Sequence, residues 1–205
     1  MQAWWMYAAV VTAVVFSPGP MTLFAMANAM SHGRRAALVG ILGGSTAYLG
    51  HLAIVYASLA TIAGWSAGTL RAVRVAGGCY FLWMAWRQWR APGLAAPSPT
   101  AAAAATPAGG LGRIWLRGFL IAATNPKAIL FFAALFPRFI DVQRPYTGQF
   151  LLLGATYLAI QFVSNASYGV AGSALMSALR RRGRERWLPR LLAVVFAAIG
   201  LVMLA

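Results

Sequence analysis

The sequence predicts an all-α integral membrane protein with six transmembrane helices, and its composition, charge distribution and proline positions support this fold class. Apolar residues make up 61% of the 205 residues and charged residues only 9%, against roughly 45–50% and about 25% in soluble domains. The first 33 residues carry no Arg, Lys, Asp or Glu, and neither do residues 36–70 or 145–179. Stretches of this length are typical of membrane spans, which need about 20 apolar residues each.

Charge and cysteine content exclude several other classes of protein. The net charge of +15 comes from 17 basic and two acidic residues, but the basic residues separate apolar stretches and do not form the solvated surface of a nucleic-acid binder. Cys79 is the only cysteine, so a disulfide framework and a cysteine-based metal site are excluded. Asp141 and Glu185 lie in separate basic loops and make no catalytic pair. We therefore expect no enzyme activity, metal, cofactor or nucleic-acid partner.

The predicted spans fall into two groups of three on either side of a linker. They cover approximately residues 4–30, 36–62, 70–90, 114–137, 148–176 and 187–205. Residues 91–112, rich in Ala and Pro, are typical of a flexible linker and separate a first repeat (1–90) from a second (113–205). The loops after the first, third and fifth spans hold twelve arginines, and the opposite loops hold four. The positive-inside rule therefore predicts that both termini lie outside the cell.

The two halves share a pattern that predicts an inverted repeat. Each contains 35 uncharged residues between two arginines, Arg35 and Arg71 in the first half and Arg144 and Arg180 in the second. Before each run, proline interrupts a span: Ser17-Pro18-Gly19-Pro20 in the first span and Asn125-Pro126-Lys127 in the fourth. An odd number of spans per half requires inverted copies, and broken helices at matching places indicate a transporter's binding site.

Each interruption predicts a half-helix that begins inside the membrane. Proline removes a helix hydrogen bond and clashes with the preceding turn, and a helix start presents N–H groups and a positive dipole end. Both starts should favour an anionic group such as a carboxylate. Lys127 lies near the middle of the fourth span, where a cation costs about 2.5–3.5 kcal/mol. Two interpretations of Lys127 stay open: its stem snorkels towards the interface, or an external anion pairs with it.

Further polar residues lie on the next span of each half. Tyr48 and His51 share a helix face on the second span, as do Gln161 and Asn165 on the fifth. Such residues serve as interhelical hydrogen-bonding groups about as often as ligand contacts. His51 is the mid-span group that titrates nearest neutral pH, so it is a proton-coupling candidate or a neutral packed histidine. The small residues Gly40, Gly43, Ala47 and Gly50 predict close helix packing.

Four motifs together give the sequence a family resemblance. They are Ser17-Pro18-Gly19-Pro20, His32-Gly33-Arg34-Arg35-Ala36, Val75-Ala76-Gly77-Gly78-Cys79-Tyr80-Phe81-Leu82 and Asn125-Pro126-Lys127-Ala128-Ile129-Leu130-Phe131-Phe132. With them the chain resembles the lysine-exporter (LysE/RhtB) family of amino-acid exporters over nearly its whole length. The resemblance implies a bacterial inner-membrane exporter of amino acids or their derivatives that exchanges them for protons, and it admits a homodimer.

These observations combine into one predicted mechanism and two alternatives. The substrate carboxylate would bind between the broken helices, at the N–H groups after Pro20 and Pro126 and at Lys127. Gln161, Asn165 and Tyr48 would contact the ammonium or side chain. Members of the family often carry an acid where Tyr48 stands, and the near absence of intramembrane acids favours neutral amino acids over lysine or arginine. The alternatives are a membrane scaffold or assembly subunit and a carrier of another small anion.

Overall fold

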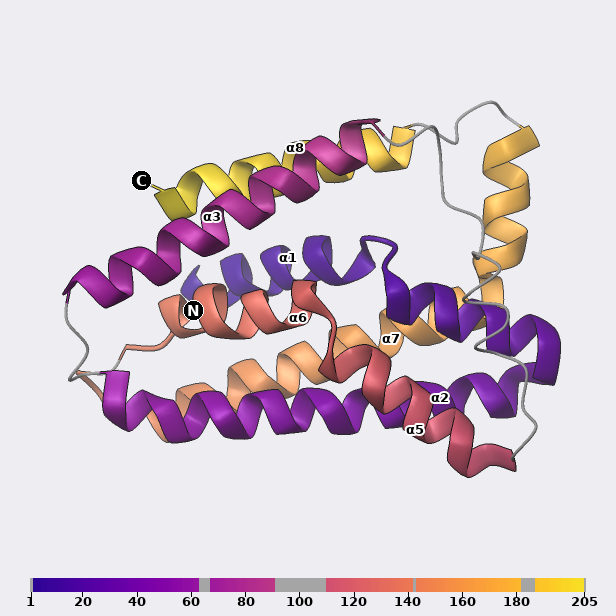
Figure 1. Ribbon diagram of the computed structural model, residues 1–205, viewed down its shortest axis with the longest axis horizontal. Helices are drawn as coiled ribbons and strands as arrows, with labels where there is room; N and C mark the ends of the chain where they lie inside the picture. Colours follow the sequence, from indigo (N-terminus) through magenta and orange to yellow (C-terminus); the bar gives the residue numbers. More distant parts are fainter. Residues whose placement is uncertain (1, 63–66, 91–109, 142, 182–186, 205) are drawn as a thin grey trace.

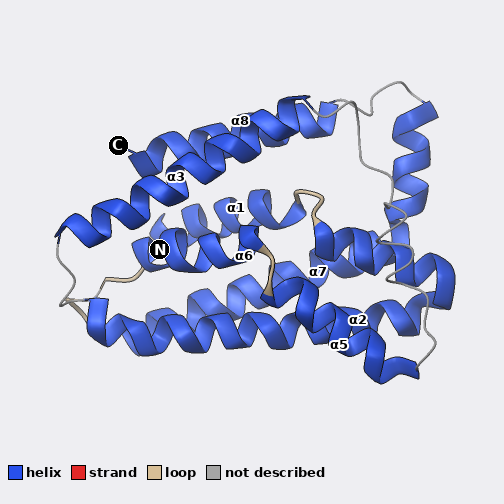
Figure 2. Ribbon diagram, in the orientation of Figure 1, coloured by secondary structure: helices blue, strands red, loops and turns tan. Residues whose placement is uncertain are grey.

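The computed structural model describes residues 2–62, 67–90, 110–141, 143–181 and 187–204, in which all regular structure is helical and no strand occurs (Figures 1 and 2). Its elements in chain order are α1 (Gln2–Phe16), α2 (Pro20–Ile62), α3 (Ala67–Arg90), α5 (Gly110–Ala123), α6 (Pro126–Leu130), the π-helix η1 (Phe131–Leu135), the 3₁₀ helix η2 (Phe136–Phe139), α7 (Tyr146–Arg181) and α8 (Trp187–Leu204). Residues 91–109, most of the predicted linker, lie outside the described residues, and α5 begins at Gly110.

Both predicted helix breaks are confirmed at the prolines. α1 ends at Phe16 and α2 begins at Pro20, while α5 ends at Ala123 and α6 begins at Pro126. The second pair of helices, Gly110–Ala123 and Pro126–Phe139, meets at 49°. Proline explains both positions because its ring fixes φ near the helical value and its missing N–H costs nothing at a helix start.

The loop predicted between the first two spans is a sharp reversal inside α2. Gly33 has φ 80° and ψ 176°, a backbone conformation that glycine adopts at low cost because it has no Cβ. We call residues 20–32 the first arm of α2 and residues 34–62 its second arm. Figure 1 shows the second arm running back past the first.

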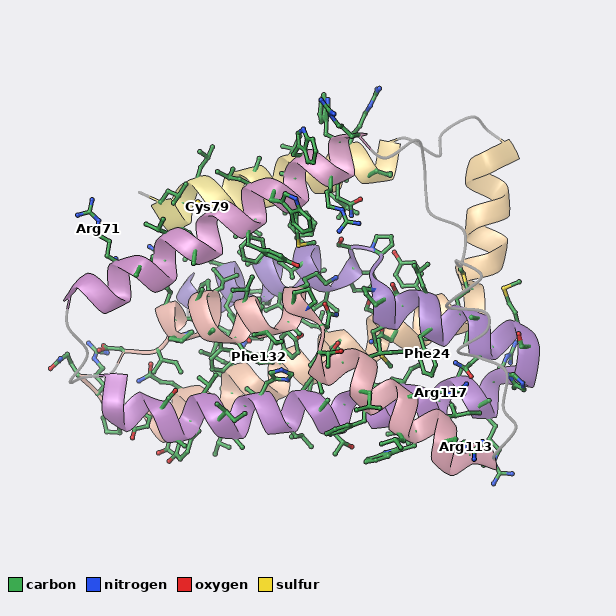
Figure 3. All side chains as sticks on the ribbon, in the orientation of Figure 1. Phe24, Arg71, Cys79, Arg113, Arg117 and Phe132 are labelled. Atoms are coloured by element: carbon green, nitrogen blue, oxygen red, sulfur yellow. The ribbon has the colours of Figure 1, made fainter. Side chains whose placement is uncertain are left out.

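By length and composition, the described residues contain two helical stretches able to cross a membrane, Pro20–Ser58 and Tyr146–Ala171. The bent pair Gly110–Ala123 and Pro126–Phe139 makes a third if it counts as one broken span, and Trp4–Phe16 and Pro189–Leu204 are shorter apolar helices. Figure 3 places Arg71 at one end of the long axis and Arg113 and Arg117 at the other, with Phe132 inside. The three labelled arginines thus lie at opposite ends of the molecule.

Glycines set how closely the helices pack. A Cβ at Gly43 would collide with the backbone of Trp115, and a Cβ at Gly118 would collide with the backbone of Gly40, so α2 and α5 touch backbone to backbone. α3 and α8 meet in the same way at Gly78 and Gly200. The prediction for Gly50 is wrong, since nothing lies within 4 Å of a Cβ added there.

An aromatic core lies between α1, η1 and α7. Tyr7, Phe131, Phe132 and Phe136 are at most 1% exposed, and Tyr157 on α7 packs on Phe131 and Phe132 with ring centroids 5.0 Å and 4.6 Å away. Burial of several rings stabilises helix contacts through area and edge-to-face geometry. This core packs η1, which follows the second break, against α1 and α7.

Candidate functional site

The start of α2 is capped by its own residues. Gly19 precedes Pro20, and its N–H donates to the Thr22 hydroxyl at 2.7 Å, while the hydroxyl lies 2.8 Å from the Gly19 carbonyl oxygen. The Leu23 N–H donates to the same carbonyl at 3.0 Å. In the part of the chain that the structure describes, the N–H groups of Met21 and Thr22 donate to no acceptor. The start of α2 therefore keeps the unused donors that the sequence predicts.

The carbonyl end of α1 is capped by side chains from the second half of the chain. The Lys127 ammonium donates to the backbone oxygens of Val14 at 3.1 Å and Ser17 at 3.0 Å. The Ser164 hydroxyl donates to Val15 O at 3.4 Å, and the Tyr168 hydroxyl donates to Phe16 O at 2.8 Å. Four consecutive carbonyls freed by the break thus all have donors, as buried backbone requires in a membrane.

This arrangement explains how Lys127 is held in the interior. Its ammonium lies at the negative end of the α1 dipole, where a cation is stabilised, and not at the positive end of α6 to which its backbone belongs. Two of its three N–H bonds are used by Val14 and Ser17. Gly19 lies beside it, since an added Cβ would be 3.1 Å from Nζ. The partners of the Lys127 ammonium are thus backbone carbonyls, which neither the snorkelling nor the external-anion interpretation included.

The start of α6 is closed, which corrects the prediction of free N–H groups there. Asn125 is the N-cap, and its side-chain oxygen accepts from the Lys127 N–H at 3.0 Å. The Ala128 and Ile129 N–H groups both donate to the Asn125 carbonyl at 3.0 Å, and Pro126 has no N–H. The Tyr48 hydroxyl also interacts with the Asn125 side chain. Asn125 is therefore a structural cap. Asn is a preferred N-cap residue and Pro a preferred first helical residue, so the Asn-Pro pair fits this helix start.

A narrow cavity lies between the two breaks, in which the centre of a water-sized molecule has about 20 Å³ of free space. α1, both arms of α2, α6, η1 and α7 contribute residues to it. The lining residues are Val14, Val15, Gly19, Met21, Thr22, Tyr48, Asn125, Lys127, Ala128, Phe131, Tyr157, Gln161 and Asn165. The cavity has an apolar side and several convergent polar groups, which is the usual composition of a small-molecule site.

Two polar atoms on α7 lack partners at this cavity. Gln161 is 1% exposed and Asn165 is 3% exposed, yet Gln161 Nε2 and Asn165 Oδ1 form no hydrogen bond within the described residues. The other end of the Gln161 amide is 3.3 Å from the Ser45 hydroxyl. An unpaired buried polar group costs about 1–3 kcal/mol, so this donor and this acceptor are available to a bound molecule.

The cavity brings together six of the predicted site residues, namely Gly19, Tyr48, Asn125, Lys127, Gln161 and Asn165. Ser17 contributes its carbonyl to Lys127, and its hydroxyl accepts from Gln88 at 3.3 Å. Pro18, Pro20 and Pro126 are not among the lining residues. Their part is to shape the breaks.

His51 lies apart from the cavity lining. Its ring stacks on Phe132 with centroids 5.5 Å apart, and its Nδ1 is 2.9 Å from the Ala47 carbonyl. Because a carbonyl only accepts, Nδ1 carries a proton. Thr22 and Tyr157 also line the cavity, although they were not predicted to do so. Their positions could have indicated it, since Thr22 lies three residues after the glycine of the first break and Tyr157 one turn before Gln161.

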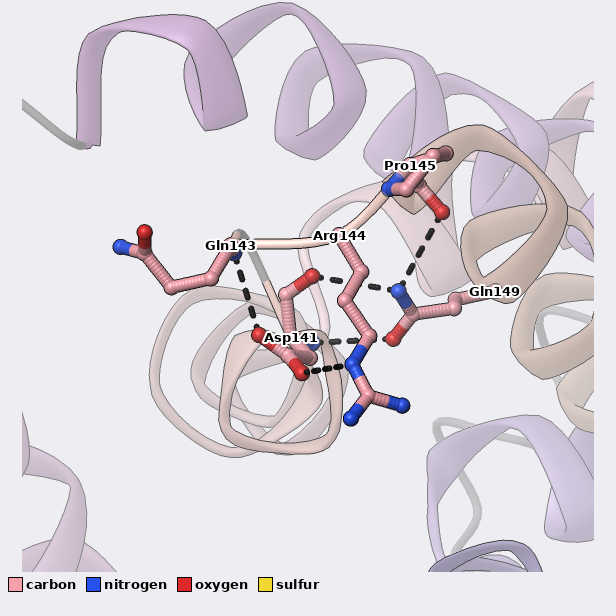
Figure 4. Close-up of polar contacts among 5 residues, drawn as sticks. All are labelled: Asp141, Gln143, Arg144, Pro145 and Gln149. Atoms are coloured by element: carbon pink, nitrogen blue, oxygen red, sulfur yellow. Dashed lines mark hydrogen bonds and ion pairs between the residues drawn. The ribbon is translucent and has the colours of Figure 1, made fainter.

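The loop between η2 and α7 holds a separate polar cluster that orders the backbone (Figure 4). Asp141 forms an ion pair with Arg144 at 3.2 Å and accepts from the Gln143 N–H at 3.0 Å. The Gln149 side-chain amide accepts from the Asp141 N–H and donates to the Asp141 carbonyl. These side chains are largely exposed, so the ion pair contributes little stability and the cluster makes no second site.

Comparison with known proteins identifies the family. The family model described as LysE type translocator matches residues 12–205. The chain belongs to the LysE type translocator family. It is 30% identical to the homoserine/homoserine lactone efflux protein of Salmonella typhimurium over 200 residues, which are 98% of this chain and 95% of that protein.

A second relative extends the comparison. The leucine efflux protein of Salmonella choleraesuis is 31% identical to this chain over 163 residues, 78% of this chain and 74% of that protein. No solved structure matches the chain. The resemblance inferred from the sequence motifs, to a family of membrane transporters for amino-acid efflux, is thereby confirmed.

Proposed function

We propose that this LysE type translocator is a secondary transporter that exports neutral amino acids or their derivatives across the bacterial cytoplasmic membrane. The observation that carries the proposal is one cavity containing a cation, Lys127, together with an unpaired donor on Gln161 and an unpaired acceptor on Asn165. An α-amino acid presents a carboxylate and an ammonium on one carbon. These groups are complementary to such a donor and acceptor set.

The carboxylate would bind on the Lys127 side of the cavity. The third N–H of the ammonium, the N–H groups of Met21 and Thr22 at the start of α2, and Gln161 Nε2 are the donors that would bind it, since all four residues line the cavity. Each favours an anion, since the start of a long helix adds a positive dipole end to the charge of Lys127. Pro20 supports this role indirectly, because it begins the helix at that point.

The ammonium and the side chain would bind to other lining residues. Asn165 Oδ1 accepts a hydrogen bond from the ammonium, with the Tyr48 hydroxyl nearby, while Phe131, Val14 and Tyr157 give an apolar surface for the side chain. None of the lining residues is an acid, so a lysine or arginine side chain would have no counter-charge. This supports a preference for neutral substrates.

Transport would follow the alternating-access scheme of inverted repeats. We propose that residues 1–90 and 113–205 are the two repeats, joined by a linker at 91–112, and that they rock about the two breaks. The arginine-rich loops would face the cytoplasm and both termini the outside. His51 would exchange a proton with the export step, because imidazole is the side chain best suited to carry protons near neutral pH. A homodimer is compatible with this scheme.

The test is efflux from cells fed a panel of dipeptides, which load the cytoplasm with free amino acids. Wild type would be compared with Gln161→Leu and Asn165→Leu at equal membrane abundance, and Val163→Leu is the matched control because Val163 is 56% exposed on the same helix. We expect wild type and the control to export a subset of neutral amino acids and both cavity variants to lose that export.

Two results would contradict the proposal. Equal efflux by cells with and without the protein would favour the scaffold alternative, which a fixed co-purifying partner would identify. Export of a simple carboxylate without an amino group would favour the carrier of another small anion. Proton coupling has its own test: His51→Gln should remove the response of efflux to an imposed pH gradient, and an unchanged response would exclude His51 from coupling.

A further inference from the structure

The unpaired polar atoms of this protein form a series along one helix interface. Within the described residues, four buried side-chain atoms lack a hydrogen-bond partner: Asn28 Oδ1, His32 Nδ1, Gln161 Nε2 and Asn165 Oδ1. The first two belong to the first arm of α2 and the last two to α7, which pack together. Folded proteins rarely leave such groups unsatisfied without water or a ligand. Their concentration on two helices that pack together indicates a polar path between these helices.

The positions of the two helices connect these atoms to the cavity. Met21 and Asn165 both line it. One turn further on, a Cβ at Gly169 would lie 3.8 Å from the Ala25 carbonyl and 3.6 Å from the Ala37 Cβ, so α7 passes between the two arms of α2 at this level. Asn28 and His32 follow at helical spacing on the face of Ala25. We call the interface from Asn165 to His32 the polar seam.

The hydrogen bonds define what Asn28 offers. Its Nδ2 donates to the Phe24 carbonyl at 2.8 Å, which fixes the orientation of the amide because a carbonyl cannot bond to Oδ1. The free atom is therefore an acceptor, and the side chain is 0% exposed. Asn165 Oδ1 at the cavity is an acceptor of the same kind. Two acceptors in succession along one interface suit a group that moves and donates, such as a primary ammonium.

We infer that the polar seam is the route by which the substrate enters the cavity from the cytoplasm, and that Asn28 Oδ1 binds the substrate ammonium on the way. His32, at the reversal next to Gly33, begins the route on the arginine-rich side, and its Nδ1 bonds water or substrate. A Cβ at Gly169 would already touch Ala37 and the Ala25 carbonyl, so the seam is closed at this level and its helices must separate for passage. This inference rests on the proposed export function. Access of a reagent to the polar seam can nevertheless be measured without measuring export.

The first experiment measures access to the seam in the full chain. The lone cysteine Cys79 is exposed, so it is replaced in a Cys79→Ser parent, into which Asn28→Cys or Leu42→Cys is introduced. Leu42 is 51% exposed on the second arm of α2 and is the lipid-facing control. A charged methanethiosulfonate is applied to inside-out and right-side-out vesicles. We expect Asn28→Cys to be modified from the cytoplasmic face, more slowly with L-leucine or L-homoserine present, and Leu42→Cys to remain unmodified.

The second experiment measures transport into inside-out vesicles. Asn28→Leu removes the acceptor with little change in volume and should raise the KM for export about ten-fold, as expected for the loss of a hydrogen bond to a charged group. Asn28→Asp keeps an acceptor and should retain a KM near that of the parent. Gly169→Val should reduce the rate by narrowing the seam, while the exposed position Val170 accepts Val170→Ile without effect.

The outcomes separate the two proposals. No modification of Asn28→Cys, or modification from the outer face alone, in a parent that exports would overturn the entry route and leave the proposed function intact. An unchanged KM in Asn28→Leu would do the same. If wild type and the Cys79→Ser parent are both abundant in the membrane and neither exports any of the tested amino acids, the proposed function is contradicted.

Discussion

The two helix breaks have the same origin in proline but are stabilised in different ways. At the first break, the carbonyls of Val14 to Ser17 accept hydrogen bonds from Lys127, Ser164 and Tyr168, all of which belong to the second half of the chain. At the second break, the local residues Thr124 and Asn125 bond the neighbouring backbone. The carbonyl end of the first break therefore depends on distant residues, whereas the second break is closed mainly by local residues, with Tyr48 as a distant contact of Asn125.

The difference shows where the two halves are coupled. Lys127 lies at the second break through its backbone and at the first break through its ammonium. Any motion that separates α6 from α1 must remove two hydrogen bonds from a buried cation, so it requires water or a ligand to replace them. We therefore expect substitutions at the first break's distant caps to affect transport, and those at the second break to affect stability.

The largest effect is expected for Lys127→Met, which keeps the length of the side chain and removes the charge. The Val14 and Ser17 carbonyls lose their donor, at a cost of about 1–3 kcal/mol each, and the cavity loses its cation. Efflux should fall to background while some protein still inserts, as measured at equal membrane abundance. Ile129→Met on the same helix is the control, since Ile129 is 41% exposed. Normal efflux by Lys127→Met would refute the role of the first break in transport.

Asn125→Ala should mainly reduce stability. Loss of an N-cap costs about 0.5–2 kcal/mol, and for a chain of this size each kcal/mol lowers Tm by about 2–4 °C. Thermal unfolding in detergent measures the change, and Asn125→Asp is the control because a carboxylate also caps a helix start. A Tm equal to that of wild type would show that the second break is not held by its cap.

Tyr168→Phe should have an intermediate effect, since it removes the donor to the Phe16 carbonyl without changing the ring. The expected loss is about 1 kcal/mol, with a several-fold decrease in efflux. Tyr56→Phe removes an exposed hydroxyl contact with Thr147 and should leave both quantities unchanged. Equal behaviour of the two variants would argue that the Phe16 carbonyl needs no cap.

The smallest effect is expected for Ser164→Ala, because its bond to the Val15 carbonyl is long at 3.4 Å. We expect at most about 0.5 kcal/mol, compared with Ser167→Ala, whose hydroxyl bonds only its own helix. Combined with Tyr168→Phe, the loss should exceed the sum of the single losses because the two bonds cap adjacent carbonyls. Strict additivity would show that the caps act independently.

The sequence was sufficient to predict the parts of the fold that depend on local chemistry. Proline positions predicted both breaks, and the polar residues Gln161 and Asn165 predicted one side of the cavity. The partners of Lys127 could not be predicted, because Nζ reaches carbonyls 110 and 113 residues away in the sequence. The sequence-based prediction of free N–H groups at the start of α6 was wrong because it did not consider Asn125 as a cap. The Asn125 side chain accepts from the Lys127 N–H, which is then not available to a ligand.

The distant caps of α1 also constrain how the chain is made. The ribosome delivers α1 and α2 to the membrane well before Lys127, Ser164 and Tyr168 have been synthesised, so the first break enters the bilayer without donors for its four carbonyls. Until the second half arrives, these carbonyls need water, the insertion machinery or a temporarily continuous helix. The second break carries its own caps and meets no such delay. Completion of the first half therefore awaits insertion of the second.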